Sequence, residues 1–121
     1  MSNESGHSVH LNYTPEFKRN LRALSRKYRH IRSDLQPVIG QLLAGEIFGD
    51  QIPGTRYTVF IVRVRNSDIP KGKSSGYRLI YYLETSTSVA LVTIYSKLDQ
   101  GDIPSQQIRR ILQELGDRQA V

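Results

Sequence analysis

Beyond a loop at 49–54 that contains Gly and Pro, the hydrophobic spacing of this chain changes from a helical period to a strand-like period. Three strand-like segments then follow one another at 58–65, 77–84 and 89–97, with no helical spacing between them. Parallel neighbours need a long crossover connection, whereas antiparallel neighbours need only a loop. The sequence therefore predicts an antiparallel three-stranded meander in the second half of the chain.

The first half predicts a short strand at 9–13 and two one-sided helices. Thr14-Pro15-Glu16 is a strong helix start, because Thr can cap, Pro suits the first helical position and Glu complements the helix dipole. Ser33 or Asp34 is expected to cap the second helix, and Gly45 to end it. A final helix is expected at 105–115, ended by Gly116. The predicted fold class is α+β: a small antiparallel sheet with an N-terminal helical hairpin and a short C-terminal helix.

Length and composition limit the function classes. The 121 residues suit one domain over 1–121, with a flexible polar tail at 1–7. The absence of Cys excludes disulfides and thiolate chemistry. No apolar run is long enough to span a membrane and the N-terminus lacks a signal-like core, so a cytoplasmic protein without a membrane partner is expected. The three His are scattered and no cofactor-binding motif is present, so neither a metal nor a cofactor is expected.

Charge and strand alternation together predict a basic sheet face. The net charge is +6, and 12 of the 17 cationic residues are Arg, whose planar fork suits phosphate. Alternation assigns the apolar side chains to the face that packs on the helices: Phe60, Val62, Val64, Leu79, Tyr81, Leu83, Ala90, Val92 and Ile94. It assigns cations and phenols to the other face: Arg63, Arg65, Arg78, Tyr82, Thr93, Tyr95 and Lys97. Lys71 and Lys73 lie in the adjoining loop, and Glu84 is the only carboxylate with matching parity.

Such a face is typical of a surface that binds single-stranded RNA, because cations neutralise phosphates and aromatic rings stack on unpaired bases. Metal-free RNA cleavage is also compatible with it. That reaction needs a proton acceptor, a proton donor and positive charge near the phosphorane. Arg supplies the charge, and Lys or Tyr can move protons where neighbouring cations lower their pKa.

Three segments together resemble the RelE/HigB-like toxins of bacterial type II toxin–antitoxin systems: residues 76–82 (GYRLIYY), 93–97 (TIYSK) and 108–112 (IRRIL). The segment 49–54 and the order of the predicted elements are also similar, and the resemblance covers about residues 9–115. It implies a RelE-like fold and a ribosome-dependent endoribonuclease that cuts mRNA and inhibits translation. It also implies a cognate antitoxin protein as partner, beside the ribosome and mRNA.

The resemblance also implies roles for individual residues. Arg78 falls where these toxins stabilise the transition state with an Arg, and Arg63 where a basic strand residue binds phosphate and serves in proton transfer. Lys97 matches a Lys at the end of the last strand, and we add Tyr95 to the catalytic set. The expected RNA-binding residues are Arg65, Lys71, Lys73 and Tyr82. The chain departs from RelE at Leu98, where RelE has an Arg, and at 102–104, where RelE has a stacking Tyr.

Two alternatives remain open at this point. A ParE-like toxin directed at DNA gyrase has the same fold but lacks the basic catalytic set, so Arg63, Arg78 and Lys97 favour the nuclease. The second alternative is a non-catalytic module that binds RNA or an acidic partner, and Leu98 is compatible with it. The basic side of the first helix is either a solvated surface or a contact for the antitoxin or ribosomal RNA: Arg19, Arg22, Arg26 and Arg29.

Overall fold

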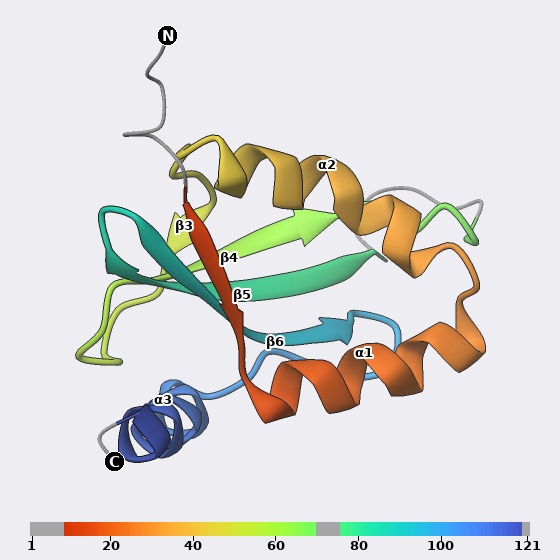
Figure 1. The fold of residues 1–121 in the computed structure, drawn as a ribbon. Coiled ribbons are helices and arrows are strands. Elements are labelled where there is room, and N and C mark those ends of the chain that lie inside the picture. Colours follow the sequence, from red (N-terminus) through yellow and green to blue (C-terminus); the bar gives the residue numbers. More distant parts are fainter. Residues whose placement is uncertain (1–8, 70–75, 120–121) are drawn as a thin grey trace, which may run out of the picture.

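The computed structural model describes residues 9–69 and 76–119 and has the predicted α+β class, with a helical hairpin near the N-terminus and a helix near the C-terminus (Figure 1). The predicted tail at 1–7 and the loop residues Lys71 and Lys73 lie outside the described residues. The elements run in this order: β2 (His10–Tyr13), α1 (Pro15–Lys27), α2 (Ile31–Leu43), β3 (Asp50–Gln51), β4 (Val59–Val64), β5 (Tyr77–Thr85), β6 (Ser88–Ser96) and α3 (Ser105–Gln119). None of the helices described is both long and apolar enough to cross a bilayer.

The sheet has five strands in the order β2-β6-β5-β4-β3. The predicted antiparallel meander of β4, β5 and β6 is confirmed. The prediction of a wholly antiparallel sheet is wrong, because β2 pairs in parallel with β6, with His10 opposite Ser88. The two helices and two of the meander strands lie between β2 and β6 in the chain, which is long enough for a parallel crossover. Strand β3 lies in the segment that was expected to be a loop, because two residues are too few to show the alternation of a strand.

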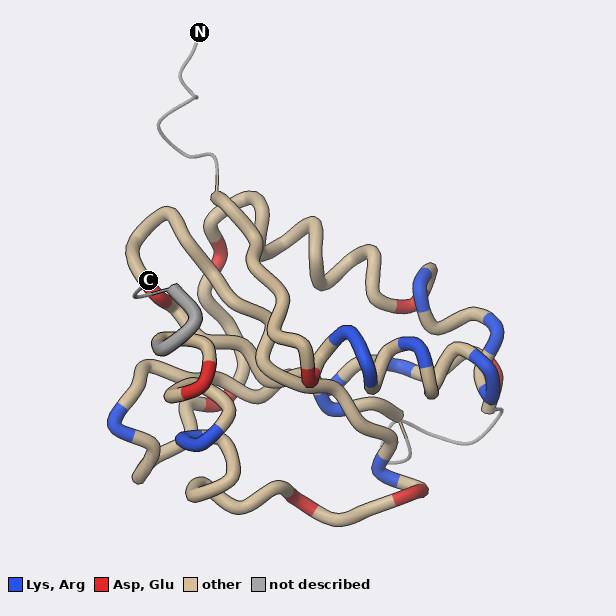
Figure 2. Tube along the Cα trace, turned by 60° about the horizontal axis from the view of Figure 1, so that its bottom comes forward, with Lys and Arg blue, Asp and Glu red and all other residues tan. Residues whose placement is uncertain are grey.

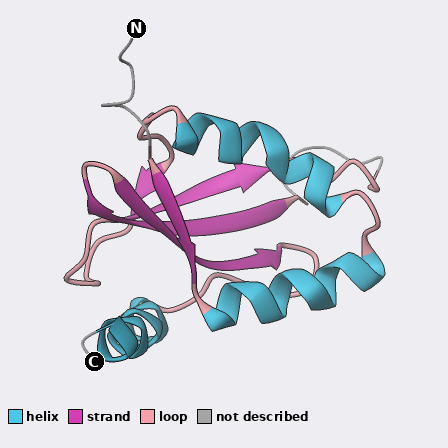
Figure 3. Cartoon of the chain, viewed as in Figure 1, coloured by secondary structure: helices cyan, strands magenta, loops and turns pink. Residues whose placement is uncertain are grey.

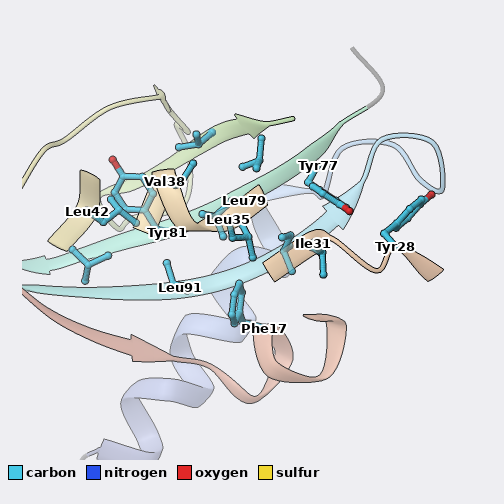
Figure 4. Packing of buried hydrophobic residues seen from close by; sticks show 14 residues of the cluster. Phe17, Tyr28, Ile31, Leu35, Val38, Leu42, Tyr77, Leu79, Tyr81 and Leu91 are labelled. Atoms are coloured by element: carbon cyan, nitrogen blue, oxygen red, sulfur yellow. The ribbon is translucent and has the colours of Figure 1, made fainter. Parts of the chain in front are cut away.

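Helices cover both faces of this sheet (Figure 3). On the first face, residues of α1 and α2 such as Phe17, Ile31 and Leu35 pack around Leu79 and Tyr81 (Figure 4). On the second face, α3 packs over a smaller cluster: Val59, Ile80, Ala90, Val92, Tyr95, Ile108, Ile111, Leu112 and Leu115. The face that was expected to be open and basic is therefore partly covered, and only its uncovered part can serve as a binding surface.

A bulge in β6 changes which side chains share a face. Ile80 pairs with Thr93 and Tyr81 pairs with Leu91, so Val92 is an extra residue. As a result Ile94 joins the first cluster, while Ala90 and Val92 lie beneath α3. The prediction that all three share the helical-hairpin face is therefore wrong for Ala90 and Val92.

The start of α1 is tied to the edge of this strand. The Thr14 hydroxyl accepts a hydrogen bond from the Phe17 amide at 2.9 Å, which confirms the predicted cap. The same hydroxyl donates to the Val92 carbonyl at 2.6 Å. Thr93, predicted on the basic face, is buried, and its Oγ1 accepts from Asn20 Nδ2 of α1 at 2.9 Å. Helix α1 thus closes the part of the β6 edge that extends beyond β2.

Gly45 follows the end of α2 with a φ of +86°, as predicted, but two other helix ends differ from the prediction. Helix α2 begins at Ile31 without a side-chain cap, so neither Ser33 nor Asp34 caps it. Asp34 instead accepts hydrogen bonds from the Ser67 amide and hydroxyl at 2.9 and 3.1 Å. Helix α3 continues through Gly116 to Gln119, because an isolated Gly weakens a helix without having to end it.

Candidate functional site

The uncovered part of the second sheet face holds a hollow of about 210 Å³, which we call the cation hollow. Its walls come from β3, from the neighbouring ends of β4, β5 and β6, and from the loop before α3: Asp50, Ile61, Arg63, Arg78, Lys97 and Asp102. Strand pairing brings these groups together, because Arg63 is opposite Arg78 and Arg78 is opposite Tyr95. Three of the four predicted catalytic residues therefore line one hollow, and Tyr95 is the cross-strand neighbour of the central one.

The two arginines of the hollow are not neutralised by carboxylates. Arg63 is exposed, whereas Arg78 is only 8% exposed and its Nη1 donates to the Tyr77 carbonyl at 3.2 Å. Neither guanidinium forms an ion pair with a residue that the structure describes. Like charges directly opposite each other on two strands are destabilising, and a bound anion removes that repulsion. The pair therefore has the unneutralised positive charge that a phosphate-binding element needs.

Lys97, Asp102 and Tyr95 form a small hydrogen-bonded group beside the arginines. Asp102 Oδ1 accepts from Lys97 Nζ at 3.3 Å and from the Tyr95 hydroxyl at 3.4 Å. Burial raises the pKa of Tyr95, and the negative charge of Asp102 raises it further, although Arg78 acts in the opposite direction. The condition under which this tyrosine could move protons, a pKa lowered by neighbouring cations, is therefore not met. Its phenol stays protonated at neutral pH and donates to Asp102.

Two carboxylates of the hollow were missed in the sequence. Strand alternation placed only one carboxylate, Glu84, on the basic face. Its Oε1 instead accepts hydrogen bonds from Asn12 Nδ2 at 2.9 Å and from the Ser88 hydroxyl at 2.7 Å. Asp50 lines the hollow from the two-residue strand β3, and Asp102 lines it from an irregular loop. Neither segment has a hydrophobic period, so alternation could not place them. The resemblance at 49–54 was the only signal that included Asp50.

Other predicted site residues lie outside the hollow. Arg65 is exposed just past the end of β4 and does not line it. Tyr82 is on the same sheet face, but it contacts Tyr57 edge to face at 5.3 Å and lines a separate hollow beside α3. The position where RelE has an Arg is held here by Leu98, an uncharged side chain that is 58% exposed. The site is therefore smaller than the patch that parity predicted.

No three or more His, Asp or Glu side chains lie close enough to hold a metal ion within the parts of the chain that the structure describes. The chemistry that this hollow offers is that of cations, two carboxylates and a protonated phenol.

Neither protein-family models nor curated proteins give a match to this chain. Its function is therefore inferred from the residues of the cation hollow and from the sequence resemblance.

Proposed function

We propose that this chain is a metal-independent endoribonuclease that cuts mRNA at the cation hollow. The observation that carries the proposal is the convergence of Arg63, Arg78 and Lys97 on one small hollow. Whole small-molecule ligands usually occupy about 300–1,000 Å³, so a hollow of about 210 Å³ suits one ribose-phosphate unit. The remainder of an RNA strand would lie along the open surface beside it.

The proposed reaction is an in-line transesterification. The ribose 2′-oxygen forms a bond to the adjacent phosphorus, and the bond from phosphorus to the 5′-oxygen of the next nucleotide breaks. The products are a 2′,3′-cyclic phosphate and a free 5′-hydroxyl. One proton leaves the 2′-hydroxyl and one is added to the departing 5′-oxygen, so a base and an acid must both be present.

The residues of the hollow divide these tasks. Arg63 and Arg78 donate hydrogen bonds to the non-bridging oxygens, where negative charge grows in the transition state. In this proposal Lys97 gives a proton to the 5′-oxygen, and a carboxylate of the hollow, Asp50 or Asp102, accepts the 2′-hydroxyl proton. Tyr95 is 3% exposed and bonded to Asp102, so we assign it a positioning role in place of the catalytic role expected from the sequence.

We further propose that the chain is the toxin of a type II toxin–antitoxin system, with the RelE-like fold of the family that its motifs resemble. The motif at 76–82 supports this assignment, because it forms most of β5 and carries Arg78. The proposed partners are the ribosome with its mRNA and a cognate antitoxin. An acidic antitoxin segment is the complement expected for a hollow with three cations.

Two observations favour a second candidate, a non-catalytic RNA-binding module. The proton donor of RelE is replaced by the exposed Leu98, and Lys97 is held by Asp102. Such a module would bind RNA through the same cations without cutting it. The two functions are distinguished by the products, not by binding.

The experiment that tests the proposal is primer extension on a translated reporter mRNA after brief induction of the chain. We expect new 5′ ends within the translated region, absent from an untranslated copy of the reporter and from the Arg78→Gln variant. Arg110→Gln removes an exposed cation on α3 outside the hollow and is the matched control, which should cut like the parent. Growth arrest without cuts would point to gyrase or another target and contradict the nuclease. Binding of RNA without cuts would support the module.

A further inference from the structure

Helix α1 and the turn after it carry a row of cations on their solvent side. Figure 2 shows basic segments recurring along α1 and into the turn toward α2. We use the name cation row for four exposed residues: Lys18, Arg22, Arg26 and Arg29. The first three follow one another at four-residue intervals, which places them within about 80° of one another around the helix and about 6 Å apart along its axis.

Most of the cation row is not neutralised by neighbouring carboxylates; only Arg29 lies near one, since its charge helps to lower the pKa of Asp68. Two other cations of α1 are paired, Arg19 with Glu16 at 2.6 Å and Lys27 with Asp99 at 2.7 Å. No member of the row forms an ion pair with any residue in the described ranges 9–69 and 76–119. The charges of Arg19 and Lys27 are neutralised by their carboxylate partners, whereas the charges of the row face solvent.

Apart from Arg26, which lies in the last turn where the helix dipole favours a cation, the row does not serve the stability of its own helix. Like charges four residues apart repel each other, which applies to Lys18 with Arg22 and to Arg22 with Arg26. Lys18 also lies in the first turns of α1, where the helix dipole disfavours a cation. Like charges kept side by side on a helix that is otherwise well capped favour a function that uses the charge.

The row and the cation hollow face in different directions. Phe17 and Tyr28 pack α1 onto the first sheet face, so Arg22 and Arg26, on the far side of the helix, point away from the sheet, while Lys18 lies on its flank. The cation hollow lies on the second face. We therefore treat a ligand of the row as a segment separate from the strand in the hollow.

We propose that the cation row docks the phosphate backbone of a structured RNA that is distinct from the strand in the cation hollow. Three of its four cations are Arg, and regularly spaced cations on a rigid helix suit a polymer with regularly spaced phosphates. The identification of this ligand as RNA rests on the proposed function. The rival occupant is an acidic peptide, because Lys18 also borders an apolar hollow between α1 and α2 lined by Leu21 and Leu35.

The test is fluorescence anisotropy with a labelled, fully paired RNA hairpin over a series of KCl concentrations. Arg22→Gln with Arg26→Gln removes two cations of the row. Arg56→Gln with Arg110→Gln removes two exposed cations outside both the row and the hollow, and is the matched control. Each lost phosphate contact lowers the slope of log K against log salt by about 0.7–0.9, so the row variant should lose about 1.4–1.8 and the control almost nothing. Arg22→Lys with Arg26→Lys keeps both charges and should keep the slope.

Equal slopes in the parent and the row variant, or an equal loss in the control, would overturn the proposal. So would a row variant that still binds the hairpin but no longer binds a polyglutamate peptide, because the row would then serve an acidic protein segment. Both Gln variants should melt no lower than the parent, since they remove only exposed cations without ion pairs. Reporter cleavage by the same proteins reports on the hollow separately, so the nuclease and the docking surface can fail independently.

Discussion

Replacing Arg63 by Gln should stabilise the protein. Arg63 is exposed, makes no ion pair within the described residues, and lies directly opposite the mostly buried Arg78 on the neighbouring strand. Like charges in this arrangement cost about 0.2–1 kcal/mol, and removing the exposed member takes away the repulsion without leaving a buried group unpaired. For a chain of 121 residues, about 0.5 kcal/mol corresponds to about 2 °C in Tm.

Urea unfolding of four proteins measures this effect as a double-mutant cycle: the parent, Arg63→Gln, Arg78→Gln and the double variant. Arg63→Gln should raise the free energy of unfolding in the parent and have almost no effect once Arg78 is Gln. High salt should reduce the gain, because screening weakens the repulsion. A destabilising Arg63→Gln, or the same gain in both backgrounds, would refute the view that the hollow stores repulsion between its arginines.

Three further predictions concern the scaffold. Thr14→Val removes a cap and a buried hydrogen bond to Val92, so it should lower the free energy of unfolding by about 2 kcal/mol, and Thr14→Ser should recover most of it, as urea titrations would show. Burial raises the pKa of Tyr77, Tyr81, Tyr82 and Tyr95. The unfolded chain therefore loses these protons first, so the free energy of unfolding should fall as the pH rises above about 10, and a stability profile without that fall would contradict the burial of these phenols. A Cβ at Gly76 would lie 2.3 Å from the Val64 carbonyl oxygen, so Gly76→Ala should separate β4 from β5 and cost about 2 kcal/mol; an unchanged midpoint in urea would show that the strands can shift freely.

Local chemistry and regular alternation account for the parts of the fold that the sequence predicted correctly. Thr14 caps α1 as expected, because a cap depends on residues within one turn. Arg63 and Arg78 were placed on one face correctly, because β4 and β5 pair without interruption. The incorrect predictions concern features that the alternation of side chains along a strand cannot reveal. The parallel pairing of β2 with β6 is set by packing between distant segments, and the extra residue Val92 reverses the parity of the strand after it.

Alternation also names a face without saying where on that face a residue lies. Tyr82 has the predicted parity but lies beside α3, away from the hollow. Asp50 and Asp102 complete the hollow from segments that have no period, so only the folded chain brings them to the cations. The basic half of the candidate site was therefore predictable from the strands, and the acidic half was not.

The central proposal is that the 2′-hydroxyl of the substrate is the nucleophile at a phosphate held by Arg63 and Arg78. The most direct measurement uses purified protein with ribosomes carrying a short synthetic mRNA, first with ribose throughout and then with one 2′-deoxynucleotide on the 5′ side of the mapped cut. The proposed chemistry predicts that the deoxy substitution abolishes that cut alone, and that the all-ribose message yields a 2′,3′-cyclic phosphate and a 5′-hydroxyl. Cleavage that continues at the deoxy position, or a 5′-phosphate on the downstream product, would contradict it.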